Sequence, residues 1–132
     1  MTRIDPVPLH NEHDIVAARQ VVRRVAHDVG LSLVDQTKLV TAASELARNA
    51  VVHGGGGEMT CEVDRVDERE RIRLVFEDHG PGIADVQLAM KDGWSSGSGL
   101  GMGLPGTRRL VNEFQLETQP GKGTRVTIAR WK

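Results

Sequence analysis

Glycine is concentrated at a few places in this chain, and those places divide it into elements. The sequence has 15 glycines among 132 residues, and most lie in four groups, at 54–57, 80–82, 97–103 and 121–123. Glycine destabilises the interior of a helix or a strand, so each group predicts an interruption. The length fits one domain of about 100–150 residues. We therefore expect a single domain over residues 1–132, with four glycine-rich turns between its helices and strands.

Two amphipathic helices are predicted before the first glycine group. The first runs from about residue 12 to 29, with Asn11 as its cap and Gly30 as its stop. The second begins at Ser32, which has an acid three residues on, and ends at His53. Each helix has one apolar stripe at helical spacing. The stripes consist of Ile15, Ala18, Val22, Val25 and Val29, and of Leu39, Ala42, Ala43, Leu46 and Ala50.

The rest of the chain favours a sheet. Alternating residues predict a hairpin of strands around Met59–Val63 and Ile72–Phe76, joined by a turn at Asp67–Glu70. A third helix is expected from Pro105 to Glu113. Each strand has one apolar side, which suits an antiparallel or mixed sheet with helices on one face, a two-layer α/β sandwich. The other extended segments are Ile4–Leu9, Gln115–Gln119 and Thr124–Trp131, the last two forming a hairpin around 120–123.

Composition argues against several classes of protein. Lys and Arg number 17 and Asp and Glu 18, so the net charge of −1 and the 3% aromatic content disfavour nucleic-acid binding. No apolar run is long enough to span a membrane, and the N-terminus lacks the pattern of a signal peptide. Cys61 is the single cysteine, which excludes a disulfide within the chain. We expect a cytoplasmic protein that binds neither nucleic acid nor membrane.

Two polar residues share one face of the second predicted helix. Glu45 and Asn49 are four residues apart, so their side chains lie one turn from each other. The carboxylate can accept a proton from a nucleophile, and the amide oxygen can bind a hard cation such as Mg²⁺. A solvated helix face is the alternative interpretation of this pair.

Asp78 ends a predicted strand on its apolar side, where a carboxylate is costly unless it is hydrogen-bonded. Gly80 and Gly82 follow, and their lack of side chains would let a ligand approach the backbone closely. An inward carboxylate beside them can accept a hydrogen bond from an exocyclic amine such as that of adenine. The alternative is a strand that ends in an ordinary turn.

The last two glycine groups differ in what they predict. The group at 97–103 precedes a predicted helix, where free backbone amides can bind phosphate; a glycine-rich linker is the alternative. It is neither a Walker loop, since no Gly-Lys-Ser/Thr follows, nor a convincing dinucleotide fingerprint. The group at 121–123 is explained by a hairpin turn. Thr124 shares strand parity with Val126 and Ile128, so its hydroxyl is expected beside Asp78.

Taken in order, these motifs resemble the four conserved boxes of the GHKL ATPases, which have the Bergerat ATP-binding fold. Within that superfamily the chain is similar to the small serine/threonine kinases of bacterial partner-switching modules, closest to the stressosome switch kinases of the RsbT type. Arg48 before the first-box asparagine favours that branch over the anti-sigma kinases, which usually carry threonine there. The segments that carry the resemblance are 14–20, 44–49, 77–83 and 92–106.

The resemblance implies a role for each matching residue. Glu45 would be the catalytic base, Asn49 would bind ATP and ligate Mg²⁺, and Asp78 would receive the adenine amine. Residues 83–98 would form the ATP lid. Arg19 and Arg48 are candidate partner contacts, although a solvated arginine is the simpler interpretation of Arg19. The other implied ATP-binding residues are Gly80, Gly82, Ile83, Gly99, Leu100, Gly101, Met102, Gly103 and Thr124.

The resemblance also implies partners. The substrates would be STAS-domain proteins, both antagonists and scaffold proteins of the stressosome. Their phosphorylation would release the kinase, which would then bind and activate a PP2C-type phosphatase. The alternative is an anti-sigma-factor kinase, or a partner-switching module that binds ATP without catalysis.

Overall fold

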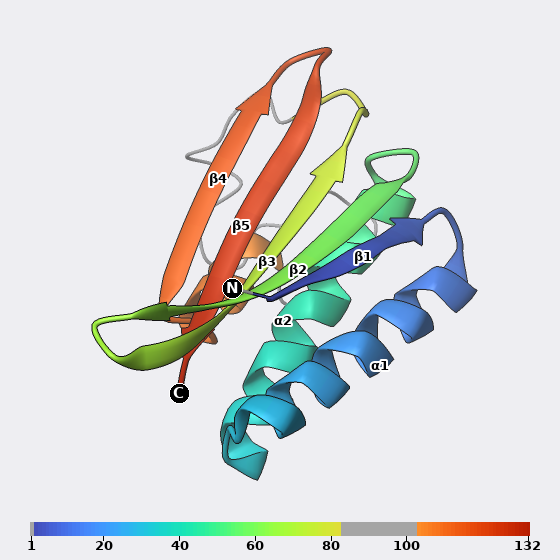
Figure 1. Ribbon diagram of the computed structural model, residues 1–132. Coiled ribbons are helices and arrows are strands. Elements are labelled where there is room, and N and C mark those ends of the chain that lie inside the picture. The colour runs from blue at the N-terminus through green and yellow to red at the C-terminus, as the bar shows by residue number, and fades with distance from the viewer. Residues whose placement is uncertain (1, 83–102) are drawn as a thin grey trace.

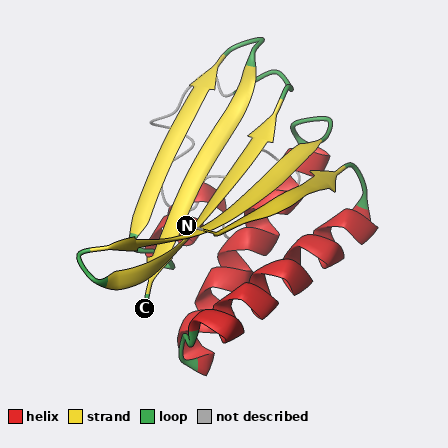
Figure 2. Cartoon of the chain, viewed as in Figure 1, coloured by secondary structure: helices red, strands yellow, loops and turns green. Residues whose placement is uncertain are grey.

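The chain folds as a sheet covered on one face by helices. The computed structural model describes residues 2–82 and 103–132. Its elements are β1 (Thr2–Leu9), α1 (Glu12–Val29), α2 (Leu33–Val52), β2 (Gly57–Val66), β3 (Arg69–Asp78), α4 (Gly103–Arg109), β4 (Glu113–Gln119) and β5 (Gly123–Trp131). The strand order is β1-β2-β3-β5-β4, and every neighbouring pair is antiparallel. Figures 1 and 2 show the helices on one side, as the predicted two-layer sandwich requires.

The two long helices begin where their caps predict. The side-chain oxygen of Asn11 accepts a hydrogen bond of 3.0 Å from the amide of Asp14, and the hydroxyl of Ser32 accepts one of 3.1 Å from the amide of Asp35. Gly30 ends α1 in the left-handed conformation, at φ 93°, which glycine adopts without steric cost. The start of each helix and the end of α1 are thus determined by local sequence.

The core lies between α1, α2 and the inner face of the sheet. Burial of each large apolar side chain contributes about 1.5–3 kcal/mol to folding. Cys61 is part of this core, and burial raises the pKa of its thiol to about 12, so the thiol stays protonated at neutral pH. The largest buried side chains are Leu9, Ile15, Leu39, Leu46, Met59, Ile72, Leu74 and Ile128.

The outer face of the sheet carries a charged network in place of a helix layer. Arg71 binds both carboxylate oxygens of Asp64, at 2.6 and 2.8 Å, and lies 3.2 Å from Glu113. The guanidinium of Arg69 lies over the ring of Trp131, 5.3 Å from its centroid. The Arg71 hydrogen bond lowers the pKa of Asp64 below its usual value. This network joins β2, β3, β4 and β5 at one end of the sheet.

Several predicted boundaries were wrong. The helix expected over Pro105–Glu113 ends at Arg109, because the amide of Asn112 already bonds the carbonyl of Ala129 and Glu113 begins β4. Sheet pairing therefore overrides the helical pattern there.

The first strand is longer than the predicted Ile4–Leu9, and its register with β2 shifts between Ile4 and Val7. Pro6 lies in that shift, where it has no amide to give the ladder. The β2–β3 turn is confined to Asp67 and Glu68, both at positive φ, because β3 starts at Arg69.

Candidate functional site

The candidate site lies where α2 ends, β3 ends and β5 begins. Gly54, just past α2, donates its amide to the carbonyl of Asn49 at 3.1 Å. A Cβ on Gly54 would lie 2.4 Å from the carboxyl carbon of Asp78, and one on Gly80 would lie 2.7 Å from the Cα of Gly54. Gly54 therefore brings the helix that carries Asn49 into direct contact with Asp78. Sequence reasoning treated Gly54 only as a helix breaker, because nothing local indicates this distant contact.

The carboxylate of Asp78 is oriented by two main-chain amides. Its Oδ1 accepts hydrogen bonds from the amide of Thr124, at 3.2 Å, and from that of Gly80, at 3.0 Å. Within residues 2–82 and 103–132, Oδ2 accepts no hydrogen bond. Strand parity directs Asp78 to the side of Ile72, Leu74 and Phe76, and the two amides meet the cost of placing a carboxylate there. One carboxylate oxygen remains for a ligand.

The loop after Asp78 is docked on the β4–β5 hairpin. Gly82 has φ +74°, and a Cβ on it would lie 2.3 Å from the carbonyl oxygen of Gln119. The amide of Gly121 donates to the carbonyl of Pro81 at 2.7 Å. Both glycines of this loop, Gly80 and Gly82, are thus required by close backbone approach, whether or not a ligand binds.

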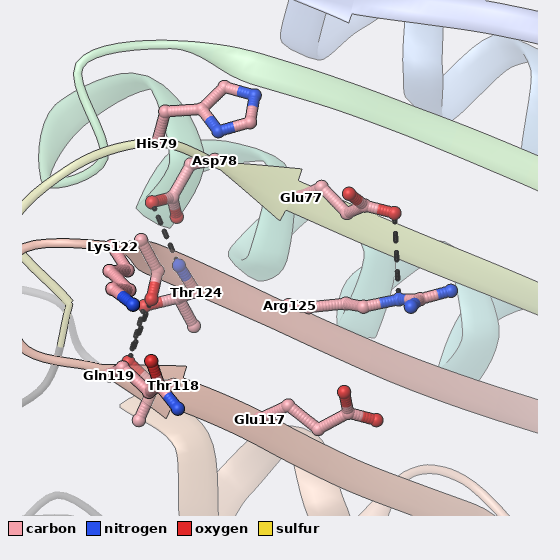
Figure 3. Close-up of a pocket in the computed structure, with 10 residues that line it drawn as sticks. Glu77, Asp78, His79, Glu117, Thr118, Gln119, Lys122, Thr124 and Arg125 are labelled. Atoms are coloured by element: carbon pink, nitrogen blue, oxygen red, sulfur yellow. Dashed lines mark hydrogen bonds and ion pairs between the residues drawn. The ribbon is translucent and has the colours of Figure 1, made fainter.

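Thr124 lies beside Asp78, as its strand parity predicts. Its hydroxyl is 3.1 Å from that of Thr118, which faces it across the β4–β5 ladder. Sequence reasoning missed Thr118, since the β4–β5 register determines which β4 residue meets Thr124. Asp78, Thr118 and Thr124 are among the residues that line a pocket of about 270 Å³ at this end of the sheet, drawn in Figure 3. Its lining also includes Glu77, Glu117 and Arg125, which strand parity places on the opposite face of the sheet from Asp78. The pocket residues are Glu77, Asp78, His79, Glu117, Thr118, Gln119, Lys122, Gly123, Thr124 and Arg125.

Asn49 carries a feature that a cation would explain. Its side-chain oxygen is buried and has no hydrogen-bond partner among the described residues. Leaving such an acceptor unpaired costs about 1–3 kcal/mol, so natural proteins rarely bury one without an ion or water. Mg²⁺ prefers oxygen ligands and takes few of them from protein. The residue thus fits the metal that the sequence motif predicts, and half-buried Glu45 lies one turn earlier on the same helix.

Some of the remaining predicted site residues lie in the described part of the chain, and others lie outside it. Gly103 is the first residue of α4. Arg48 forms an ion pair of 3.1 Å with Glu12 at the start of α1, and Arg19 is exposed on α1. The predictions for Ile83, Gly99, Leu100, Gly101 and Met102, and for the lid over 83–98, fall outside the described residues.

No helix within residues 2–82 and 103–132 combines the length and the apolar character that a membrane span requires.

A family model for the histidine kinase-, DNA gyrase B- and HSP90-like ATPases matches residues 34–132. The chain belongs to this family, the GHKL ATPases, in agreement with its open antiparallel sheet and one-sided helix layer. The serine/threonine-protein kinase RsbT of Bacillus subtilis is 43% identical to it over 95% of the chain and 94% of that protein. This similarity makes the chain a protein-serine/threonine kinase of that family.

One further relative in sequence is an anti-sigma factor, and one solved structure shares the fold. The anti-sigma F factor of Clostridium kluyveri is 27% identical over 86% of the chain and 82% of that protein. The crystal structure of the RsbU and RsbW domains of a Mycobacterium tuberculosis protein superposes with a TM-score of 0.63. It shares 20% identity, covers 98% of this chain and extends well beyond it, since the match takes in 33% of the solved chain. That likeness concerns the fold alone.

Proposed function

We propose that this protein is a Mg²⁺- and ATP-dependent kinase that phosphorylates serine or threonine in STAS-domain proteins of a stressosome. The single observation that carries the nucleotide part is the contact of Gly54 with Asp78, which joins the helix of Glu45 and Asn49 to the end of β3. The acceptor class rests on the 43% identity with RsbT over nearly the whole of both chains.

Each residue of the proposed site has a defined task. ATP would supply the phosphoryl group, and Mg²⁺ would neutralise the charge that develops during its transfer. Glu45 takes the proton from the acceptor hydroxyl, a contribution of about 10²–10⁴-fold in rate. Asn49 would hold the metal through its side-chain oxygen, which has no hydrogen-bond partner within residues 2–82 and 103–132. Asp78 accepts the adenine amine through Oδ2, while its Oδ1 stays fixed by two amides.

The other proposed ATP contacts surround these three residues. Thr124 and Gly80 each donate a main-chain amide to Asp78, and these two residues, together with Gly82, are proposed to contact the adenine. Backbone amides of the glycine group that ends at Gly103 are proposed to bind the phosphates. Ile83, Gly99, Leu100, Gly101 and Met102 complete the set on sequence grounds.

The proposed partner cycle rests on the likeness to RsbT, and two arginines are its candidate contact residues. Arg48 is half-exposed beside Glu45 and Asn49, and Arg19 is exposed on the neighbouring helix, so both are proposed to contact protein partners. Phosphorylation of the STAS protein would release the kinase, which would then bind and activate a PP2C-type phosphatase in the cytoplasm.

The test incubates the protein with Mg²⁺-ATP and a STAS protein encoded nearby, with mapping of the phosphorylated residue. Glu45→Gln is expected to bind ATP with wild-type affinity and to transfer phosphate at least about 100-fold more slowly. Glu68→Gln, an exposed acid in the β2–β3 turn, serves as the matched control for transfer. Wild-type protein that binds ATP and leaves every STAS protein unmodified would contradict the proposal.

The second candidate function is an anti-sigma-factor kinase or a module that binds ATP without catalysis. The 27% identity with an anti-sigma F factor over 86% of the chain favours it. Affinity purification distinguishes the two, since this alternative predicts a sigma factor in the eluate and the main proposal predicts a STAS protein.

A further inference from the structure

Three polar side chains form a row across the inner face of the sheet, at the end where the candidate site lies. Asp78 of β3 pairs with Thr124 of β5, and Thr124 pairs with Thr118 of β4. Residues directly opposite each other on neighbouring strands have Cβ atoms about 4.5–5.5 Å apart. The two threonine hydroxyls are 3.1 Å apart, as a dashed line in Figure 3 marks. The hydroxyl next to Asp78 is therefore in contact with a second hydroxyl on the next strand.

The direction of the hydrogen bond between the two hydroxyls follows from a third group. Thr118 donates its hydroxyl proton to the carbonyl oxygen of Gly123 at 3.0 Å, and a carbonyl oxygen can only accept. A hydroxyl has one proton and two lone pairs, so the oxygen of Thr118 accepts in its bond with Thr124. The proton of the Thr124 hydroxyl is thus directed at Thr118, along a chain of hydrogen bonds that ends on the Gly123 carbonyl.

This chain determines what Thr124 can offer a ligand. With its proton engaged by Thr118, the oxygen of Thr124 retains a lone pair and has no proton to donate. The carboxylate of Asp78 is likewise an acceptor, since two amides hold Oδ1 and Oδ2 accepts no hydrogen bond in the part of the chain that the structure describes. Two neighbouring acceptors match an amino group, directly or through one water, and disfavour a carbonyl group in its place.

We propose that Thr118 is a positioning residue for base selectivity, which keeps the Thr124 hydroxyl oriented as a hydrogen-bond acceptor. The ligand class that this orientation favours is a purine nucleotide with an amino group at position 6, over one with a carbonyl group there. The inference rests on the proposed function, since it uses the contact assigned there between Asp78 and the adenine amine. Thr118 acts through Thr124 and is not assigned a contact with the nucleotide.

The test measures the affinities for ADP and for IDP in Mg²⁺ by calorimetric titration. The two nucleotides have the same ribose and phosphates, and IDP has a carbonyl group at position 6 and a proton on the adjacent ring nitrogen. The ratio of the two affinities therefore reports on the base, because effects on the phosphates cancel. Wild-type protein is expected to prefer ADP at least about 10-fold, since IDP has no proton at position 6 for Asp78 to accept.

Three single variants are compared with wild type. Thr118→Val has nearly the same shape and removes the hydroxyl, so the Thr124 proton becomes available to the carbonyl of IDP, and the preference for ADP is expected to fall about 3- to 10-fold. Thr118→Ser keeps the hydroxyl and should keep the preference within about 2-fold of wild type. Thr127→Val is the matched control, because Thr127 is half-buried on the opposite face of β5, and the preference should be unchanged.

A double variant separates the orientation of Thr124 from a purely structural effect of Thr118. In a Thr124→Val background, Thr118→Val is expected to change the preference for ADP no further, because the hydroxyl that Thr118 orients is already absent. Thermal unfolding is recorded for every variant, so that a loss of stability is seen separately from the affinity ratio. Should Thr118→Val fail to fold, Thr118→Ala takes its place in the same titrations.

The outcomes distinguish failure of this inference from failure of the proposed function. Thr118 does not orient Thr124 toward the base if its valine variant retains the wild-type preference, if Thr118→Ser loses the preference to the same extent, or if the effect persists in the Thr124→Val background. If wild-type protein does not bind ADP, or binds IDP as tightly as ADP, the contact of Asp78 with the adenine amine is wrong, and the proposed nucleotide site is wrong with it.

Discussion

Asp78 and Gly54 show how single atoms determine the candidate site. The inward direction of Asp78 follows from the period of two along a strand, so sequence alone could predict it. The role of Gly54 could not be predicted, because its only indication is a contact with a residue 24 positions away. The chemical groups of the candidate site can thus be predicted from the sequence, whereas the packing contact that brings them together cannot.

Asp78→Asn is expected to weaken ATP binding about 10- to 100-fold, because a hydrogen bond to a charged group contributes about 1.5–3 kcal/mol. Folding should suffer little, since the amide oxygen of asparagine can still accept from Thr124 and Gly80. Calorimetric titration with ATP measures the effect, and Asp64→Asn on the outer face of the sheet is the control. If Asp78→Asn binds ATP with wild-type affinity, Asp78 does not bind the adenine amine.

Gly54→Ala is expected to lower both stability, by about 1–3 kcal/mol, and ATP affinity, since the new Cβ would displace Asp78. Gly55→Ala is the matched control. Gly55 has φ +69° with nothing near its Cβ position, so alanine there strains the backbone without touching Asp78. If Gly54→Ala and Gly55→Ala change the ATP affinity equally relative to wild type, the contact of Gly54 with Asp78 does not contribute to ATP binding.

The helices differ in how far sequence determines them. α1 and α2 were predicted well, because their caps and apolar stripes are local signals. The end of α4 was predicted four residues too late, because Asn112 and Glu113 satisfy their backbone groups in the sheet. The placement of Glu45 and Asn49 on one helix was therefore predictable, whereas the hydrogen bonds from Arg130 to Asp35 of α2 and to the carbonyl of Leu110 after α4 required the structure.

Asn49→Ala is expected to abolish the dependence of ATP affinity on Mg²⁺, because it removes the oxygen proposed to hold the metal, for which the described residues offer no hydrogen-bond partner. The metal-free variant should be at least as stable as wild type, since a buried acceptor without a partner in residues 2–82 and 103–132 is lost. Titrations with ATP in Mg²⁺ and in EDTA measure the first effect, and thermal unfolding measures the second. Gln36→Ala, on the first turn of the same helix, is the control; persistence of the metal dependence in Asn49→Ala would assign the ligand to another residue.

At the scale of the whole molecule, the two faces of the sheet determine how the stability of the protein depends on pH. The inner face is apolar, as its alternating pattern predicted, and the outer face relies on the network of Arg71, Asp64 and Glu113. Opposite charges on neighbouring strands were visible in the sequence. Their pairing was not, because it depends on the register of β2 with β3 and of β4 with β5.

Asp64→Asn is expected to lower the thermal midpoint by a few degrees at pH 7. The Arg71 hydrogen bond lowers the pKa of Asp64 in the folded protein below its usual 3.8, so its stabilisation is present above that pH. It is lost as the pH falls through the lower folded value, and the difference between the variant and wild type should then shrink. Thermal unfolding at several pH values between 7 and 2.5 checks this; a difference that stays constant across the range would contradict the assignment.

The prolines of β1 restrict how this protein can aggregate. Pro6 and Pro8 remove two amide donors from a strand of eight residues that forms one margin of the sheet, and its register is already broken near Pro6. An unpaired strand margin invites foreign chains to extend the sheet. A kinase proposed to exchange protein partners would benefit from such a margin, because encounters with other proteins would be less prone to end in irreversible fibre growth.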